Sequence, residues 1–159
     1  MGKPFILYKF RTMKNVYDNR RNFIPDKDRL TTFGSCLRKP SFDELPELFN
    51  ILKGEMSLVE PRPLLMRYLE RYTPKQMLRH EVKPGMTGWA QVNGRNVISW
   101  QKRFELDVRS VNHLTFRLDV RIVWLTLIKV IRRESINAGK DLTMPLFMVT
   151  MKRREKLMN

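Results

Sequence analysis

The sequence is poor in the residues that metal and redox chemistry most often use. It contains a single cysteine, Cys36, and two histidines, His80 and His113, in unrelated surroundings. It has no CxxC pair, no HExxH motif and no phosphate-binding glycine loop. These absences exclude an intramolecular disulfide and argue against zinc sites and histidine-based triads. We expect Cys36 to be a small core residue of a protein from a reducing compartment.

Long apolar runs are also missing. No segment approaches the roughly 20 consecutive apolar residues that span a bilayer, and the first ten residues, MGKPFILYKF, lack the apolar stretch of a signal peptide. As written, the chain is not expected to cross a membrane. Its 159 residues, 42% hydrophobic and 30% charged, predict one folded domain. The basic tail over residues 148–159 is expected to be loose.

Acidic residues are scarce relative to basic ones. The chain has 31 Lys and Arg against 16 Asp and Glu, which gives a formal net charge of +15. This excess predicts a polyanionic partner, and nucleic acid, an anionic lipid surface or a phosphorylated substrate would each satisfy it. A nucleic-acid-binding protein would show a recognisable fold or basic residues interleaved with stacking aromatics. The sequence shows neither clearly, so nucleic acid is the alternative and not the expected partner.

The first third of the chain contains a predicted strand and a predicted loop. Residues 5–13 are rich in aromatic and branched side chains, with Lys9 and Arg11 on one side of the two-residue period. This pattern predicts a strand. Residues 14–34 have mixed polarity and a proline, which predicts an irregular loop.

A helix is predicted within residues 41–56, because leucines and a phenylalanine recur at helical spacing and Gly54 suits its end. Its start has two interpretations. Ser41 and Glu44 have the spacing of a capping box, whereas Pro46 favours the first turn. In either case Asp43 and Glu44 would lie near the positive end of the helix dipole.

The middle of the chain alternates turns with short elements. Pro61-Arg62-Pro63 interrupts regular structure, and a short helix over 64–71 follows it. Thr73, with Pro74 and Gln76, predicts a capped second helix. Glycines flank a short apolar piece at 88–92. We therefore predict a mixed α/β fold dominated by helices, with a small sheet near residues 9–13 and 88–92.

Residues 118–133 predict an amphipathic helix. Its basic residues fall within one narrow arc, and its apolar residues, Trp124 among them, spread over the opposite side. A basic helix that carries a tryptophan can lie in a lipid interface. A core helix with a solvated basic edge explains the same pattern equally well.

Two adjacent carboxylates, Asp43 and Glu44, are the strongest candidates for chemistry. They follow Arg38 and Lys39 at the predicted helix start. One carboxylate of such a pair can attack phosphorus or bind a divalent ion while the other holds the ion or the geometry. Helix capping and the helix dipole explain acidic residues at this position without any chemistry.

Basic residues beside turns are candidates for phosphate binding. Arg62 lies between two prolines and Arg95 between Gly94 and Asn96, so both extend from stiffened or sharply turned backbone that suits bidentate contacts. The other candidates of this kind are Lys9, Arg11 and Arg38. For all of these side chains a solvated surface position is the ordinary alternative.

Three segments together resemble the bacterial sugar transferase family. They are KFRTM at 9–13, LRKPSFDELPELFNILKGEMSLVEPRP at 37–63, and VKPGMTGWAQVNGRN at 82–96. LTFRLDVRIVWLTL at 114–127 is also similar. The family comprises the monotopic phosphoglycosyl transferases that begin polysaccharide and glycan assembly on a polyprenyl phosphate. The resemblance implies a catalytic domain over residues 1–147, with amphipathic membrane-surface helices and without the family's N-terminal membrane helix.

The resemblance implies a reaction and roles for individual residues. Asp43 would attack the β-phosphate of a UDP-sugar, release UMP and form a phosphosugar ester, which polyprenyl phosphate then accepts. Asp43 and Glu44 would help to place Mg²⁺. Phosphate-binding or architectural roles are implied for Lys9, Arg38, Arg62 and Arg95. Arg11, Asn96 and Asp119 are further possible site residues.

The resemblance also implies a location, and the sequence departs from the family in places. The expected location is the cytoplasmic face of the bacterial inner membrane, where a peripheral or monotopic protein would contact anionic lipid. Glu60 stands where the family has glycine, so we expect a strained turn or weaker anion binding there. Arg109 and Arg117 stand where the family has aromatic or apolar residues. A truncated, catalytically impaired family member is the alternative that the missing N-terminal helix and Glu60 suggest.

Overall fold

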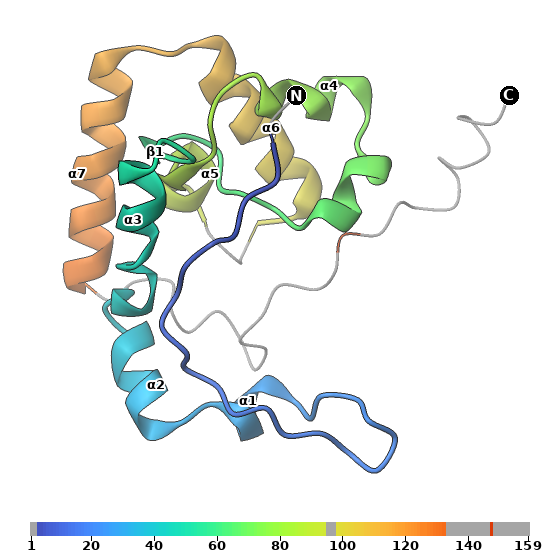
Figure 1. Ribbon diagram of the computed structural model, residues 1–159. Coiled ribbons are helices and arrows are strands. Elements are labelled where there is room, and N and C mark those ends of the chain that lie inside the picture. The colour runs from blue at the N-terminus through green and yellow to red at the C-terminus, as the bar shows by residue number, and fades with distance from the viewer. Residues whose placement is uncertain (1–2, 95–97, 133–146, 148–159) are drawn as a thin grey trace, which may run out of the picture.

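A computed structural model of the chain describes residues 3–94, 98–132 and 147 (Figure 1). Helices dominate it and a single small sheet is present in the described part, as predicted. The α-helices are α1 (Asp26–Arg29), α2 (Thr32–Arg38), α3 (Glu47–Leu52), α4 (Pro74–Met77), α5 (Trp89–Val92), α6 (Trp100–Asn112) and α7 (Phe116–Arg132). The 3-10 helices are η1 (Phe42–Glu44), η2 (Met66–Arg71) and η3 (Leu78–His80).

The sheet consists of two parallel strands, β1 (Ser57–Val59) and β2 (Gly85–Thr87), with Ser57 opposite Gly85 and Val59 opposite Thr87. Strand β2 lies directly before residues 88–92, near one of the two predicted positions of the sheet, and the other predicted position, at residues 9–13, was wrong. Residues 9–13 contribute a single bridge, between Met13 and Leu30, and residues 89–92 form helix α5. The pairing joins segments that are far apart in the sequence, which local patterns do not reveal.

The predicted strand over residues 5–13 was wrong because side chains and loop carbonyls satisfy its backbone instead of a partner strand. Asn50, fully buried on α3, accepts a hydrogen bond from the Tyr8 amide at 3.1 Å. The Asn50 amide donates to the Ile6 carbonyl at 2.8 Å. The Phe10 amide donates to the Asp43 carbonyl at 2.9 Å. The N-terminal segment is therefore fastened along η1 and α3.

The region expected to be an irregular loop contains two helices. Thr31 caps α2 by accepting a hydrogen bond from the Gly34 amide at 2.8 Å. A Cβ atom on Gly34 would lie 2.1 Å from the Thr12 carbonyl oxygen, so glycine lets α2 approach the N-terminal segment. Cys36, on the same helix, is exposed, and its predicted core position was wrong.

The helix predicted within 41–56 is divided into η1 and α3. Ser41 has a φ of 62° and makes no side-chain cap hydrogen bond, so the predicted capping box is absent. Pro46 immediately precedes the first residue of α3. Gly54 has a φ of 75° and follows the helix end, as predicted. Asp43 and Glu44 consequently lie on the short 3-10 turn and not in the longer helix.

Glu60 follows β1 and does not strain the chain. Positive φ angles among the described residues occur at Arg21, Ser41, Gly54 and Gly94, so Glu60 needs no left-handed conformation. Its amide donates to the Thr87 carbonyl at 2.8 Å. The expected strained turn at this residue was therefore wrong.

The second half of the chain follows the local signals closely. The capping box at Thr73 forms as predicted, with Gln76 supplying both reciprocal contacts. The expected helix over 64–71 is the 3-10 helix η2. The amphipathic helix expected at 118–133 is α7, with Ile122 1% exposed on its inner face and Trp124 64% exposed on its outer face.

Two apolar clusters form the core. Val59, Val92 and Ile122 join β1, α5 and α7. Tyr68 of η2, Phe104 of α6 and Phe147 form the second cluster. A hydrogen bond of 2.7 Å between the hydroxyls of Thr87 and Thr126 also fastens α7 to β2. Within the described ranges, no helix has the length and apolarity needed to cross a bilayer.

Candidate functional site

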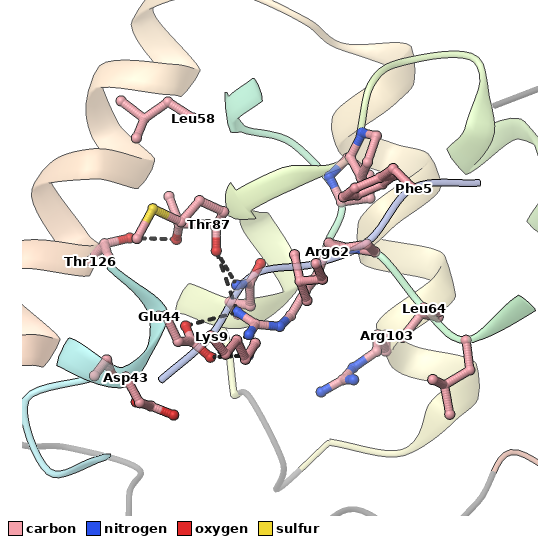
Figure 2. A pocket seen from close by; sticks show the side chains of 18 of the residues that line it. Phe5, Lys9, Asp43, Glu44, Leu58, Arg62, Leu64, Thr87, Arg103 and Thr126 are labelled. Carbon is pink, nitrogen blue, oxygen red and sulfur yellow. Dashed lines mark hydrogen bonds and ion pairs between the residues drawn. The ribbon is translucent and has the colours of Figure 1, made fainter. Parts of the chain in front are cut away.

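A cavity of about 1270 Å³ lies between the N-terminal segment, η1, the Pro61-Arg62-Pro63 loop, β2 and α6. Figure 2 shows its acidic and basic side chains converging from these separate elements. The structure brings five of the predicted site residues to its wall: Lys9, Arg38, Asp43, Glu44 and Arg62. The site is thus assembled from segments that are distant in the sequence.

Asp43 presents a partly buried carboxylate to the cavity. Its side chain is 13% exposed, and its Oδ2 atom lies 4.0 Å from Nε of Arg38. Burial and the neighbouring Glu44 raise the pKa of Asp43, and Lys9 and Arg38 oppose that rise. The carboxylate therefore has weaker cationic stabilisation than that of Glu44.

Glu44 is held tightly between two cations. Lys9 donates to its Oε1 atom at 2.9 Å, and Arg62 contacts both oxygens, with Nη1 3.0 Å from Oε2. Burial alone would raise the pKa of Glu44, but Arg62 and Lys9 outweigh it and lower the pKa to about 2. Glu44 is therefore a fixed anion that positions both cations.

A third acid, Glu47, belongs to the same cluster and was not among the predicted site residues. Its side chain is 0% exposed and lies 3.1 Å from Lys9 and 3.4 Å from Arg62. Its other oxygen, Oε2, is buried and has no hydrogen-bond partner. Burial raises the pKa of Glu47 despite Arg62 and Lys9. The sequence signal that could have identified Glu47 is its three-residue spacing from Glu44.

Arg62 is oriented by its own loop and by a buried ion pair behind it. The Arg62 carbonyl accepts a hydrogen bond from Nη2 of Arg79 at 2.7 Å. Arg79 donates in turn to Asp107 on α6 at 3.0 and 3.2 Å, and both side chains are buried. The Arg62 side chain also reaches the Met86 carbonyl at 3.4 Å. Sequence reasoning did not identify Arg79 or Asp107, because no local motif marks them.

The remaining candidates divide into those at the cavity and those elsewhere. Arg38 donates to the Thr12 hydroxyl at 2.9 Å and so holds the wall beside Asp43. Arg11 is exposed and is not among the cavity-lining residues. Asp119, on α7, lines a smaller hollow together with Trp124. Burial, with a smaller contribution from Asp119, raises the pKa of Glu60 to about 7. Arg95 and Asn96 lie outside the described residues.

The resemblance implies a magnesium ion near Asp43 and Glu44. No group of three or more His, Cys, Asp or Glu residues that could hold a metal occurs in the described part of the chain. Both oxygens of Glu44 already accept hydrogen bonds from cations, whereas Asp43 faces the cavity. Mg²⁺ commonly takes one or two carboxylates together with substrate phosphates and water. The residues present fit such an ion, with Asp43 as the more available ligand.

Residues 1–133 match the family model described as bacterial sugar transferase. An uncharacterized sugar transferase of Bacillus subtilis, EpsL, is 58% identical over 146 residues, which is 92% of this chain and 72% of that protein. UDP-glucose:undecaprenyl-phosphate glucose-1-phosphate transferase of Xanthomonas campestris is 39% identical over 84% of this chain. Undecaprenyl-phosphate galactose phosphotransferase of Salmonella typhimurium is also 39% identical over 84%. The chain spans 30% and 32% of these last two relatives.

Proposed function

The chain belongs to the bacterial sugar transferase family, and on that premise we propose that its cavity transfers a sugar-1-phosphate from a UDP-sugar to polyprenyl phosphate. The observation that carries the proposal is the pairing of Asp43 with Glu44. One carboxylate faces the cavity, while the other is locked between Lys9 and Arg62. Relatives whose names specify undecaprenyl-phosphate sugar-phosphate transfer support the same reaction class.

Asp43 is the proposed nucleophile. Both oxygens of Glu44 are occupied by cations, and its pKa of about 2 makes it a weak nucleophile. Asp43 has a raised pKa, and its nearest cation, Arg38, is farther away than the cations that contact Glu44. In the proposed first step a carboxylate oxygen of Asp43 bonds to the β-phosphorus, and the bond from that phosphorus to the bridging oxygen breaks. UMP leaves with the electron pair.

The second step restores the enzyme. An oxygen of polyprenyl phosphate bonds to the same phosphorus, and the bond to Asp43 breaks, which regenerates the carboxylate. The product is a polyprenyl-diphosphate sugar, as the first membrane step of polysaccharide or glycan assembly would require. A carboxylate is suited to this double displacement because it is both a nucleophile and, on phosphorus, a competent leaving group.

Lys9, Arg38 and Arg62 would reduce the electrostatic repulsion between the attacking carboxylate and the phosphate. A carboxylate and a phosphate oxygen about 4 Å apart repel by about 4 kcal/mol at an effective dielectric of about 20. Arg62, Lys9 and Arg38 lie on the wall where this repulsion would develop. When bound, Mg²⁺ would neutralise diphosphate oxygens, with Asp43 as a ligand. Glu44 would bind Mg²⁺ only if the ion replaced one of its contacts with Lys9 or Arg62.

We further propose that the outer face of α7 rests on the anionic surface of the cytoplasmic leaflet. Phe116, Trp124 and Ile131 on this helix are 82%, 64% and 79% exposed. The same helix carries Arg121, Lys129 and Arg132. Exposed aromatic and aliphatic groups with basic neighbours are typical of helices in a lipid interface. Polyprenyl phosphate would present its phosphate at that level.

The test is UMP release by the purified chain, incubated with a UDP-sugar panel, Mg²⁺ and a short polyprenyl phosphate. Wild type is expected to release UMP with at least one donor, and Asp43→Asn is expected to release none above background. Absence of UMP with every donor would favour the catalytically impaired alternative. Activity retained by Asp43→Asn would remove the nucleophile assignment.

A further inference from the structure

Arg103 is a cationic side chain at the cavity that lies outside the predicted site. It extends from α6 and lines the same cavity as Asp43. Figure 2 shows its guanidinium directed toward the middle of the cavity, on the side of Arg62 away from Asp43. The guanidinium carbon lies 5.2 Å from the centre of the Trp100 ring, which helps to hold the side chain in this direction.

The surroundings of Arg103 favour a bound anion. Burial lowers the pKa of Arg103, and the charges of Arg62 and Arg79 lower it further, against the opposing effect of Asp107. Asp107 already accepts two hydrogen bonds from Arg79. Arg62 is engaged with Glu44 and Glu47. A phosphate placed against Arg103 would relieve the mutual repulsion of these three guanidinium groups.

We propose that Arg103 binds the phosphate that leaves with the nucleotide, the α-phosphate of the UDP-sugar. This inference rests on the proposed function. If the β-phosphorus lies at Asp43, the α-phosphate is one bridging oxygen farther along the donor. Figure 2 shows Arg103 on the side of Arg62 away from Asp43, so a donor that extends from Asp43 past Arg62 would bring its α-phosphate toward Arg103. A guanidinium there can donate two parallel hydrogen bonds to phosphate oxygens and stabilise the charge that builds on the departing UMP.

The sequence offers a matched control on the same helix. Arg109 also belongs to α6 but is exposed and does not line the cavity. Arg103→Gln and Arg109→Gln therefore remove the same charge from the same helix, and they differ in access to the cavity. Both variants are compared with wild type for thermal unfolding, UMP affinity and steady-state kinetics with each substrate varied in turn.

Arg103→Gln is expected to weaken UMP binding by about 10- to 100-fold, the range for a lost hydrogen bond to a charged group. The value of kcat/KM for the UDP-sugar should fall at least as far, and kcat/KM for polyprenyl phosphate should remain unchanged. Arg109→Gln should retain wild-type UMP affinity and donor kinetics. Thermal unfolding of both variants shows whether a loss of UMP affinity reflects the lost cation or a loss of fold.

Several outcomes separate the inference from the function on which it rests. Failure of wild type to release UMP would overturn the proposed function itself. Normal turnover by wild type with equal UMP affinity in Arg103→Gln and Arg109→Gln would overturn the role of Arg103 alone. A fall confined to kcat/KM for polyprenyl phosphate would also overturn it, because the bound phosphate would then be the acceptor's.

A second variant keeps the test decisive if Arg103→Gln does not fold. Arg103→Lys retains the charge but cannot make two parallel hydrogen bonds. A UMP affinity several-fold below wild type in folded Arg103→Lys supports the inference. Unchanged affinity in that variant would contradict it.

Discussion

Replacing Glu44 by Gln is expected to destabilise the fold at pH 7 even though Gln has nearly the same shape. The pKa of Glu44 falls from its ordinary value of 4.5 to about 2 in the folded protein, because Arg62 and Lys9 outweigh the effect of burial. Each pH unit between the two values corresponds to about 1.4 kcal/mol. The charged form of Glu44 therefore stabilises the fold by about 3 kcal/mol, as an order of magnitude, and Glu44→Gln loses it.

The same cations give the opposite expectation for Glu47. Burial raises the pKa of Glu47 above its ordinary value despite Arg62 and Lys9, so its charged form is the less favoured one in the folded state. Glu47→Gln should therefore change the free energy of unfolding much less than Glu44→Gln, or increase it. Comparing the two variants therefore separates the effect of desolvation on the free energy of unfolding from the effect of ion pairing.

Urea unfolding followed by circular dichroism measures both effects, with Glu105→Gln as the control. Glu105 forms an exposed pair with Lys102 at 3.4 Å, and such pairs contribute only about 0–1 kcal/mol. A depressed pKa stabilises the fold above the unfolded value of 4.5 and loses that effect as the pH falls toward 2. The difference between wild type and Glu44→Gln should shrink over that interval. Destabilisation no larger than that of Glu105→Gln, or smaller than that of Glu47→Gln, would refute the reasoning.

Three further predictions concern the frame around the site. Arg79→Met leaves Asp107 buried without its ion-pair partner and should lower the free energy of unfolding by about 3–5 kcal/mol, measured in urea. Gly34→Ala places a Cβ 2.1 Å from the Thr12 carbonyl oxygen and should lower the unfolding temperature; an unchanged temperature would contradict the close packing. Burial, with a smaller contribution from Asp119, raises the pKa of Glu60 to about 7. Wild type should therefore lose stability as the pH rises from 4.5 through 7, and Glu60→Gln should lose less over the same interval, because the contribution of Glu60 is then absent.

Local patterns predicted those parts of the fold that depend on neighbouring residues. The helix α7, the capping box at Thr73 and the helix end at Gly54 each rest on spacing within a few residues. The parallel pairing of β1 with β2 does not, because it joins residues 57–59 to 85–87. The N-terminal segment was predicted as a strand from its aromatic and branched side chains. Its backbone is instead bound by Asn50, which belongs to a helix distant in the sequence, so no local pattern reveals this contact.

The residues of the candidate site also divide into those that local motifs predicted and those that only the fold brings together. The motifs around residues 9, 38, 43–44 and 62 identified side chains that the structure gathers at one cavity. The supporting residues were missed. Arg79 and Asp107 look like ordinary charged residues of short helices until the fold buries them against each other. Glu47 is on a helix whose leucines suggested only an apolar face, yet its side chain is 0% exposed beside Lys9 and Arg62.

The central claim is that Asp43 carries the phosphosugar during turnover. Wild type is incubated with a UDP-sugar that supports turnover and Mg²⁺ without acceptor, quenched in acid and digested. Mass spectrometry of the peptide that contains Asp43 and Glu44 then gives the modified residue. The account predicts one added phosphosugar on Asp43, absent from Asp43→Asn and removed when polyprenyl phosphate is added before quenching. A modified Glu44, or UMP release that requires acceptor and leaves no adduct, would contradict it.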